Sequence, residues 1–433
     1  MIDLRRITRT FPAQERKSPP LPVLSDITLR IPPGQYAAMV GASGSGKSTL
    51  MNILGCLDRP TSGVYRLHGR DVSALPPDEL AKVRGEEIGF VFQGFQLIPR
   101  LTAIENVMLP LMLQGVSESE RRARAEQLLL RVGLHSRMHH LPAALSGGQQ
   151  QRVAIARTLA PEPSVLFMDE PLSNLDAKLR LEMRYELQRL HVETGSTFVY
   201  VTHDQMEAMT LATQICLINN GVLQQYQPPL TVYNHPQNLF VADFVGNPSI
   251  NFVEAKGAQQ PDGSITLDIL GGVKAVFRPR EGLDLAAWFA ERDRKAAAHA
   301  AERLAKSQEK GYVEKGNKDE PFSYHIAKVE EEDDSLQEEP ILTNEDLVLG
   351  IRPEFLNITS EAPLKGEIYG AMPTGMESTI KVYVNGFLLT GVVFGSSLFT
   401  IGEQHSISFT GHHIMLFDRQ SGDCIALGSL ETL

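Results

Sequence analysis

Residues 41–49 read Gly-Ala-Ser-Gly-Ser-Gly-Lys-Ser-Thr and fit the spacing Gly-x4-Gly-Lys-Ser/Thr. The apolar residues 36–40 before them predict a buried strand, and residues 49–54 after them predict the first turns of a helix. Glycines allow backbone N–H groups to surround phosphate oxygens without Cβ clashes, and the free N–H groups at a helix start carry partial positive charge. The stretch therefore predicts a phosphate-binding loop for a nucleotide, placed between a strand and a helix.

The side chains of this loop have distinct expected tasks. Lys47 is expected to reach the β- and γ-phosphates of ATP, and the Ser48 hydroxyl to ligate Mg²⁺. Upstream, Phe11 is a candidate for stacking on the adenine ring, with an ordinary core position as the alternative. The loop residues predicted to bind the nucleotide are Gly41, Ser43, Gly44, Ser45, Gly46, Lys47, Ser48 and Thr49.

The composition is that of an ordinary globular protein with room for two or three domains, since the chain has 433 residues, 42% hydrophobic and 21% charged. The net charge of −11 argues against a nucleic-acid-binding surface, where a basic patch is expected. Three distant cysteines without a Cys-x-x-Cys pair indicate reduced thiols. The N-terminus lacks a signal-peptide pattern, and no apolar run approaches a membrane span. We therefore expect a cytoplasmic protein that partners hold at the inner face of the cell membrane.

The segments around the loop predict further regular structure. Residues 1–35 alternate between apolar and polar and predict an antiparallel sheet. Residues 88–92 predict an apolar strand that ends at Gln93. Residues 104–140 predict helix, and the periodicity of its later part places Leu128, Leu129 and Val132 on the inner face.

A second candidate anion site follows at residues 145–149, which read Leu-Ser-Gly-Gly-Gln and precede a helical run. This order places Ser146, Gly147, Gly148 and Gln149 at a helix N-terminus, where free N–H groups favour phosphate. A single Ser-Gly-Gly is usually a flexible loop. Two phosphate-seeking helix starts in one chain are harder to attribute to chance.

Carboxylates and a histidine follow two later strands. Residues 165–168 predict a buried parallel strand that ends in Asp169 and Glu170. Asp169 is expected to hold Mg²⁺ through water, and Glu170 to polarise the attacking water. Asp176 is predicted in the first turn of the next helix. His203 follows the strand at 198–201, at the end where parallel α/β sheets bind ligands.

In this order the motifs resemble those of the ATP-binding-cassette (ABC) ATPases. The correspondence runs through Walker A (41–49), the Q-loop (Gln93), the signature (145–149), Walker B with the D-loop (165–176) and the switch histidine (His203). The resemblance implies an α/β phosphate-loop NTPase domain with a helical subdomain, over residues 1–238.

The resemblance also implies roles and a dimer. Glu170 would be the general base, His203 the γ-phosphate sensor, and Gln93 a contact of both Mg²⁺ and the attacking water. ATP would lie between Walker A of one subunit and the signature of the other, so a homodimer or a heterodimer with a similar ATPase is required. Lys47, Glu170 and His203 form the implied catalytic set; Ser48, Gln93 and Asp169 the metal set; Gln93, Ser146, Gly147, Gly148, Gln149 and Asp176 further nucleotide contacts.

Two subfamilies are represented within this stretch. Residues 1 to 160 look like macrolide-exporter and lipoprotein-release ATPases, with cues at 52–63, 90–102 and 149–152. From residue 163 onward the chain looks like maltose and multiple-sugar importer ATPases, with cues at 169–176, 200–210 and 244–252. A recombined or engineered chain and natural mosaic drift are both compatible with this pattern.

Residues 239–433 predict a second domain of short strands separated by Gly and Pro, typical of a small β-barrel. Residues 350–354, Gly-Ile-Arg-Pro-Glu, resemble a motif of the oligosaccharide-binding-type regulatory barrel of sugar-importer ATPases. Its expected tasks are dimer contact and the binding of a protein or small-molecule regulator. A charged insertion at 285–345 predicts a solvated helix and a mobile acidic run at 330–334, where a regulator could dock.

The leading functional hypothesis is therefore the ATPase subunit of a sugar or oligosaccharide importer, bound to integral membrane permease subunits. An exporter or lipoprotein-release motor is the alternative, because residues 93–113 face the membrane partner in this superfamily. A non-transport ATPase of translation or DNA repair is disfavoured, since tandem cassettes, a coiled-coil insertion and zinc-type cysteines are absent from the sequence.

Overall fold

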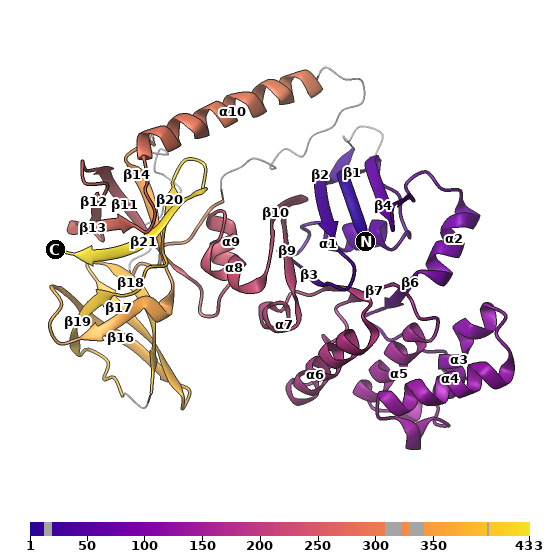
Figure 1. The fold of residues 1–433 in the computed structure, drawn as a ribbon. Coiled ribbons are helices and arrows are strands. Elements are labelled where there is room, and N and C mark those ends of the chain that lie inside the picture. The colour runs from indigo at the N-terminus through magenta and orange to yellow at the C-terminus, as the bar shows by residue number, and fades with distance from the viewer. Residues whose placement is uncertain (13–19, 308–321, 330–341, 396–397) are drawn as a thin grey trace. The chain divides into compact units, whose positions relative to one another are not determined.

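The computed structural model describes residues 1–12, 20–307, 322–329, 342–395 and 398–433 (Figure 1). Contacts within the chain divide it into two compact units, one comprising Met1–Leu230 and the other the described residues from Thr231 onward. The predicted acidic run at 330–334 lies outside the described residues.

The first unit combines an antiparallel sheet, a mostly parallel sheet and two groups of helices. Its elements are β1 (Ile2–Phe11), β2 (Leu21–Ile31), β3 (Tyr36–Val40), α1 (Lys47–Leu54), β4 (Ser62–Leu67), β5 (Arg70–Asp71), α2 (Pro77–Glu86), β6 (Ile88–Val91), α3 (Ala103–Leu113), α4 (Glu118–Arg131), α5 (Gly147–Leu159), β7 (Val165–Asp169), α6 (Ala177–Thr194), β8 (Thr197–Val201), α7 (Gln205–Leu211), β9 (Gln214–Asn219) and β10 (Val222–Gln227).

The parallel sheet has the order β10-β9-β3-β8-β7-β6, and all of its neighbours are parallel except the β9–β10 hairpin. All five residues of β3 are buried, as expected for a central strand covered on both faces. The antiparallel sheet has the order β2-β1-β4-β5, in agreement with the prediction for residues 1–35. This order puts the carboxyl ends of β3, β6, β7 and β8 along one edge.

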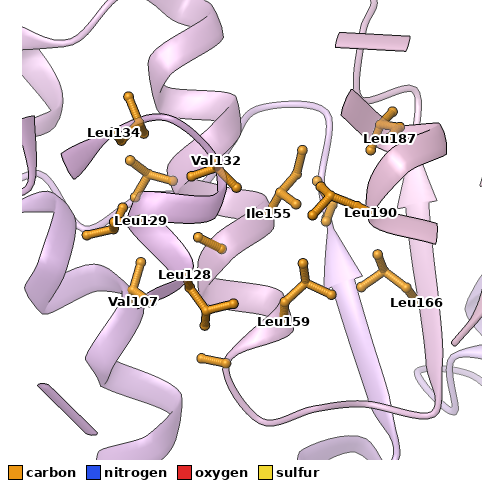
Figure 2. Packing of buried hydrophobic residues seen from close by; sticks show 14 of the residues in the cluster. Val107, Leu128, Leu129, Val132, Leu134, Ile155, Leu159, Leu166, Leu187 and Leu190 are labelled. Atoms are coloured by element: carbon orange, nitrogen blue, oxygen red, sulfur yellow. The ribbon is translucent and has the colours of Figure 1, made fainter. Parts of the chain in front are cut away.

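The helical subdomain, formed by α3, α4 and α5, packs on one face of the parallel sheet. Leu128, Leu129 and Val132 are buried there, as the periodicity predicts. Figure 2 shows this cluster, in which Ile155 and Leu159 of α5 lie between Leu128 and Leu129 of α4 on one side and Leu166 of β7 on the other. The stretch 104–140, predicted to be helical, contains two α-helices and a short 3-10 helix: α3 ends at Leu113, α4 follows the N-cap Ser117 and ends at Arg131, and His135–Arg137 form the 3-10 helix. Gly115 adopts φ +78° between α3 and α4 and turns the chain.

The second unit is built from two antiparallel sheets and a long helix. Its elements are α8 (Pro229–Asn234), which crosses the boundary, α9 (Leu239–Phe244), β11 (Asn251–Gln259), β12 (Ile265–Ile269), β13 (Val273–Pro279), α10 (Leu285–Ser307), β14 (Asp346–Ile351), β15 (Leu356–Thr359), β16 (Leu364–Pro373), β17 (Glu377–Val384), β18 (Phe387–Phe394), β19 (Gln404–Phe409), β20 (Ile414–Asp418) and β21 (Cys424–Thr432). Six strands close into a barrel, and β15-β19-β16-β17-β18 form the other sheet.

The long helix α10 falls where the solvated helix is predicted. Its first turns are anchored, since Leu285 and Phe289 are buried in the barrel core. Arg292 adds a salt bridge to the fully buried Asp418, with Nη1 3.0 Å from Oδ1. From Asp293 to Leu304 most residues are exposed, which agrees with a polar, Ala-rich surface.

A buried arginine fixes the start of the second unit to its barrel. The Arg352 guanidinium is 1% exposed and donates to the carbonyls of Ala242 (3.0 Å), Tyr233 (2.9 Å) and Val245. It also lies 4.1 Å from the centre of the Tyr233 ring. Residues 231–238 therefore belong with the second unit, whereas the sequence placed the domain boundary after residue 238.

We expect Arg352→Met to destabilise the second unit by about 2–4 kcal/mol, because it leaves three buried carbonyls without donors. Trp288 is the single tryptophan of the chain and lies against the core of this unit, so its fluorescence reports the unit's unfolding in denaturant. Arg278→Met is the matched control, since the Arg278 side chain is 58% exposed. Equal midpoints for both variants would contradict the anchoring role.

Candidate functional site

The loop at residues 41–46 is shaped by glycines that no other residue can replace without movement. Gly41 adopts φ +151°, and a Cβ there would lie 2.0 Å from the Ile218 carbonyl oxygen of β9. Gly46, the N-cap of α1, adopts φ +101°, and a Cβ there would lie 2.7 Å from Leu24 of β2. The loop backbone therefore lies close against two neighbouring strands, β9 and β2.

The polar groups of this loop fit a phosphate. Lys47 is 9% exposed and donates from Nζ to the carbonyls of Gly41 (3.0 Å) and Ala42 (2.8 Å). Burial lowers the pKa of Lys47, while Glu170 and Asp169 oppose this shift. The buried Ser45 hydroxyl has no partner in the described structure. The Lys47 ammonium, which bonds to carbonyls of its own loop, and the unpartnered Ser45 hydroxyl are hydrogen-bond donors, and phosphate oxygens are suitable acceptors for both.

The carboxylate expected to bind a metal comes from β7, which β8 separates from β3 in the parallel sheet. Asp169 ends β7, and its pKa is raised by burial and by the neighbouring Glu170 charge, while Lys47 lowers it. Among the described residues, no group of three or more His, Cys, Asp or Glu side chains is arranged to hold a metal. Mg²⁺ usually binds through one or two protein oxygens together with substrate phosphates. A hydroxyl from Ser48 and a carboxylate from Asp169 match that donor set.

Glu170 is the centre of a hydrogen-bonded group that joins three loops. Its Oε1 lies 3.1 Å from His203 Nδ1, and its Oε2 accepts from Gln93 Nε2 at 3.4 Å. Gln93 also donates to Ser173 Oγ at 3.2 Å. Glu170 adopts φ +43°, a strained conformation for a non-glycine residue and one that clusters at functional sites. The fold thus brings together Glu170, Gln93 and His203, three side chains far apart in the sequence.

An ionic network beneath His203 was not anticipated from the sequence. Arg184 Nη2 of α6 lies 3.0 Å from Asp204 Oδ2 and 3.6 Å from Glu207 Oε1. Arg180, one turn earlier, lies 3.8 Å from the same Asp204 oxygen. Glu207 is 3% exposed, and its Oε2 accepts hydrogen bonds from the Tyr200 hydroxyl at 2.6 Å and the Thr202 hydroxyl at 2.8 Å. The one sequence signal was Asp204 three residues before Glu207, a helix N-cap pattern, and Asp204 indeed caps α7.

The signature residues form a capped helix start that packs against α6. Ser146 caps α5, and its backbone N–H donates to Gln149 Oε1 at 3.0 Å, completing a capping box. A Cβ on Gly148 would lie 2.4 Å from Leu179 Cδ2, whereas one on Gly147 would lie 3.7 Å from Leu175. Gly148 therefore has a packing reason to be glycine, independent of the phosphate contact predicted for it. No hydrogen bond or ion pair within the described chain joins residues 146–149 to residues 41–49.

Asp176 and Phe11 are both predicted to contact the nucleotide. Asp176 is the N-cap of α6 and accepts from Leu179 N at 2.9 Å, so the prediction of a first-turn position was wrong by one residue. Phe11 is half-buried, and the Arg9 guanidinium covers one face of its ring at 4.5 Å. Arg9 is itself held by Asp58 at 2.9 Å. Adenine stacking on Phe11 stays a prediction for the other face of the ring.

The fold and the site together define a phosphate-loop NTPase with a helical subdomain. The family model described as "ABC transporter" matches residues 24–173. The chain is 44% identical over 257 residues to the maltose/maltodextrin import ATP-binding protein MalK of Yersinia pestis, covering 59% of this chain and 68% of that protein. It is 34% identical over 422 residues to a putative ATP-binding protein of Brucella suis, covering 97% and 98%. The chain belongs to the ABC transporter ATPase family.

Similarity also extends to an exporter. The chain is 50% identical over 226 residues to the macrolide export ATP-binding/permease protein MacB of Syntrophobacter fumaroxidans, covering 52% of this chain and 31% of that protein. Among solved structures it is similar to the dimeric, post-hydrolysis ATP-binding cassette MJ0796 bound to ADP and Pi, with TM-score 0.48, 41% identity and coverage of 53% and 99%. A match of 226 residues cannot be confined to the 160 residues that the sequence assigned to the exporter type.

The packing of Gly148 gives a first test of the site. We expect Gly148→Ala to lower the free energy of unfolding by about 1–3 kcal/mol, because the new methyl group overlaps Leu179. Gly147→Ala is the matched control and should be neutral or slightly stabilising, because alanine favours the helix more than glycine does. Thermal unfolding without nucleotide measures both. A similar melting temperature for the two variants would refute this packing role.

The network beneath His203 gives a second test. We expect Arg184→Gln to lower the turnover number for ATP about tenfold to a hundredfold, because Asp204 and the adjacent His203 lose their support. ATP affinity should be unchanged, since the phosphate loop is untouched. Arg184→Lys should restore part of the rate, and Arg189→Gln, at a 55% exposed side chain of the same helix, is the control. Parallel losses of affinity and turnover would indicate general unfolding instead.

Proposed function

We propose that this chain is the ATP-hydrolysing subunit of a sugar or oligosaccharide importer, working as a dimer on membrane permease subunits. The carrying observation is the second unit, a closed six-stranded barrel with an adjoining five-stranded sheet after the cassette. Relatives described as import proteins extend past the first unit, including an sn-glycerol-3-phosphate import ATP-binding protein of Agrobacterium fabrum, 39% identical over 284 residues. None of the described helices combines the length and apolar character that a membrane crossing requires.

The roles of the site residues follow from their geometry. Glu170 would orient and deprotonate the attacking water, with its carboxylate held by Gln93 on one oxygen and by His203 on the other. Lys47 and the loop N–H groups would bind the phosphates, and Ser48 with Asp169 would hold Mg²⁺. The metal, when bound, supplies charge neutralisation on the phosphates. Asp176 and residues 146–149 would serve the nucleotide of a second subunit, in keeping with the lack of any hydrogen bond or ion pair between residues 146–149 and residues 41–49 in the described chain.

Export is the second candidate, and two observations favour it. The match to the macrolide export protein has the higher identity, 50%. The segment after Gln93 also exposes apolar side chains suited to a membrane partner, since Ile98 is 38%, Met112 50% and Leu113 78% exposed. Both candidates share the ATPase cycle and differ in the permease that this surface contacts.

The deciding experiment is a pull-down from detergent-solubilised membranes of the source cell with tagged Glu170→Gln protein and ATP. We expect this variant to hydrolyse ATP at least about a hundredfold more slowly than the parent, because the amide cannot accept the proton from water. It should therefore stay in the closed dimer and retain its permease. Glu193→Gln, an exposed carboxylate of α6, is the control and should keep the parent rate.

The identity of the captured protein separates the two candidates. A pair of multi-span permeases of the importer type would support sugar import and point to the substrate. An exporter-type protein with a large extracytoplasmic domain would refute it and establish export. Hydrolysis by Glu170→Gln at the parent rate would refute the role of Glu170.

A further inference from the structure

The second unit contains a pocket that the ATPase site does not use. Its volume is about 410 Å³, and its walls come from residues 235–237, 280–283 and 424–427. For comparison, the hollow beside Glu170 and His203 measures about 40 Å³. A volume of this size is in the range that holds small-molecule ligands.

The pocket forms where the barrel strands part. β13 pairs with β21 as far as Pro279 opposite Gly428, and Arg280 N then donates to Leu427 O at 2.8 Å before the chain turns away. The β20–β21 ladder shifts register between Leu416 and Phe417, whose partners are Ala426 and Cys424, so Ile425 is the extra residue of a bulge. Bulges are over-represented beside functional sites because they redirect side chains.

A cation and an imidazole line this pocket. Arg280 is exposed and lines it, and no carboxylate within the described chain forms an ion pair with its guanidinium. His235 also lines it and stands edge-on to His413, with ring centres 6.1 Å apart. Burial lowers the pKa of His413, and Arg280, His235 and His412 lower it further.

The remaining lining supplies the opposite chemistry. Glu281 is exposed beside Arg280 and is the one carboxylate of the wall formed by the described residues. The Glu281 carboxylate oxygens can accept hydrogen bonds from hydroxyl groups of a ligand. Their negative charge repels an anionic group. A guanidinium and one imidazole together with a carboxylate acceptor suit a ligand that carries both an anionic group and hydroxyl groups.

We propose that this pocket binds a small sugar phosphate. The phosphate would be bound by Arg280 and His235, and the sugar hydroxyls by Glu281. A ligand here would connect residues 235–237 to the barrel, and these residues begin five positions after the last residue of the first unit. The proposal deepens the regulatory role expected for the barrel, yet the binding itself does not rest on the direction of transport.

The test is isothermal titration calorimetry on the full chain with glucose 6-phosphate, glucose and inorganic phosphate as separate probes. We expect glucose 6-phosphate to bind, with an affinity at least tenfold higher than either glucose or inorganic phosphate. Arg280→Gln should weaken this binding at least tenfold. Arg278→Gln, two residues away and outside the pocket lining, should bind as the parent does. Trp288 fluorescence unfolding confirms that each variant keeps its second unit folded.

The outcomes distinguish the alternatives. Equal binding by Arg280→Gln and the parent, or no binding of glucose 6-phosphate to the parent, would overturn the proposal. Inorganic phosphate binding as tightly as glucose 6-phosphate would overturn the sugar half of the assignment. ATP hydrolysis by Arg280→Gln without sugar phosphate should match that of the parent. A lack of sugar-phosphate binding would therefore leave the proposed ATPase function intact. A failure of the proposed ATPase function would likewise leave the binding proposal intact.

Discussion

The close approach of the 41–46 loop to β9 is the constraint on which the site depends. A single Cβ on Gly41 would come within 2.0 Å of the Ile218 carbonyl, so the loop can lie where it does only as glycine. Because β3 lies between β8 and β9, this contact also sets the loop level with the carboxyl ends of the other parallel strands. Lys47, Asp169 and His203 reach one edge for that reason. The arrangement of the candidate site thus depends on the strand order of the parallel sheet and on the absence of a Cβ atom at Gly41.

A chain of contacts links the start of α6 to Glu170. Asp176 begins α6, and the same helix carries Arg184, whose guanidinium holds Asp204 at the start of α7. His203 immediately precedes Asp204 and bonds to Glu170. If Asp176 contacts a second subunit as proposed, its displacement would act on Glu170, the proposed general base, through α6, the Arg184–Asp204 ion pair and His203.

Much of this arrangement could be read from the sequence, and the part that could not has a common cause. The loop, the strand ends and the capped helix at Ser146 depend on residues close together in the chain, where glycine spacing and apolar runs are informative. The Arg184–Asp204 pair and the Gly148–Leu179 contact join segments 20 and 31 residues apart, and local patterns do not encode such pairings. Asp176 was misplaced by one residue because cap and first-turn positions both favour aspartate. The break between α3 and α4 was missed because helical periodicity resumes after Gly115.

Arg352 bears on how the barrel could influence the cassette. Three backbone carbonyls between Tyr233 and Val245 end on one buried guanidinium, so the chain leaving the first unit is fixed to the barrel within a few residues. A buried charge held by three carbonyls and the Tyr233 ring is costly to disturb, and the connection should behave as part of the barrel. Under the regulatory role proposed for the barrel, the residues of this connection would therefore move with the barrel rather than independently of it.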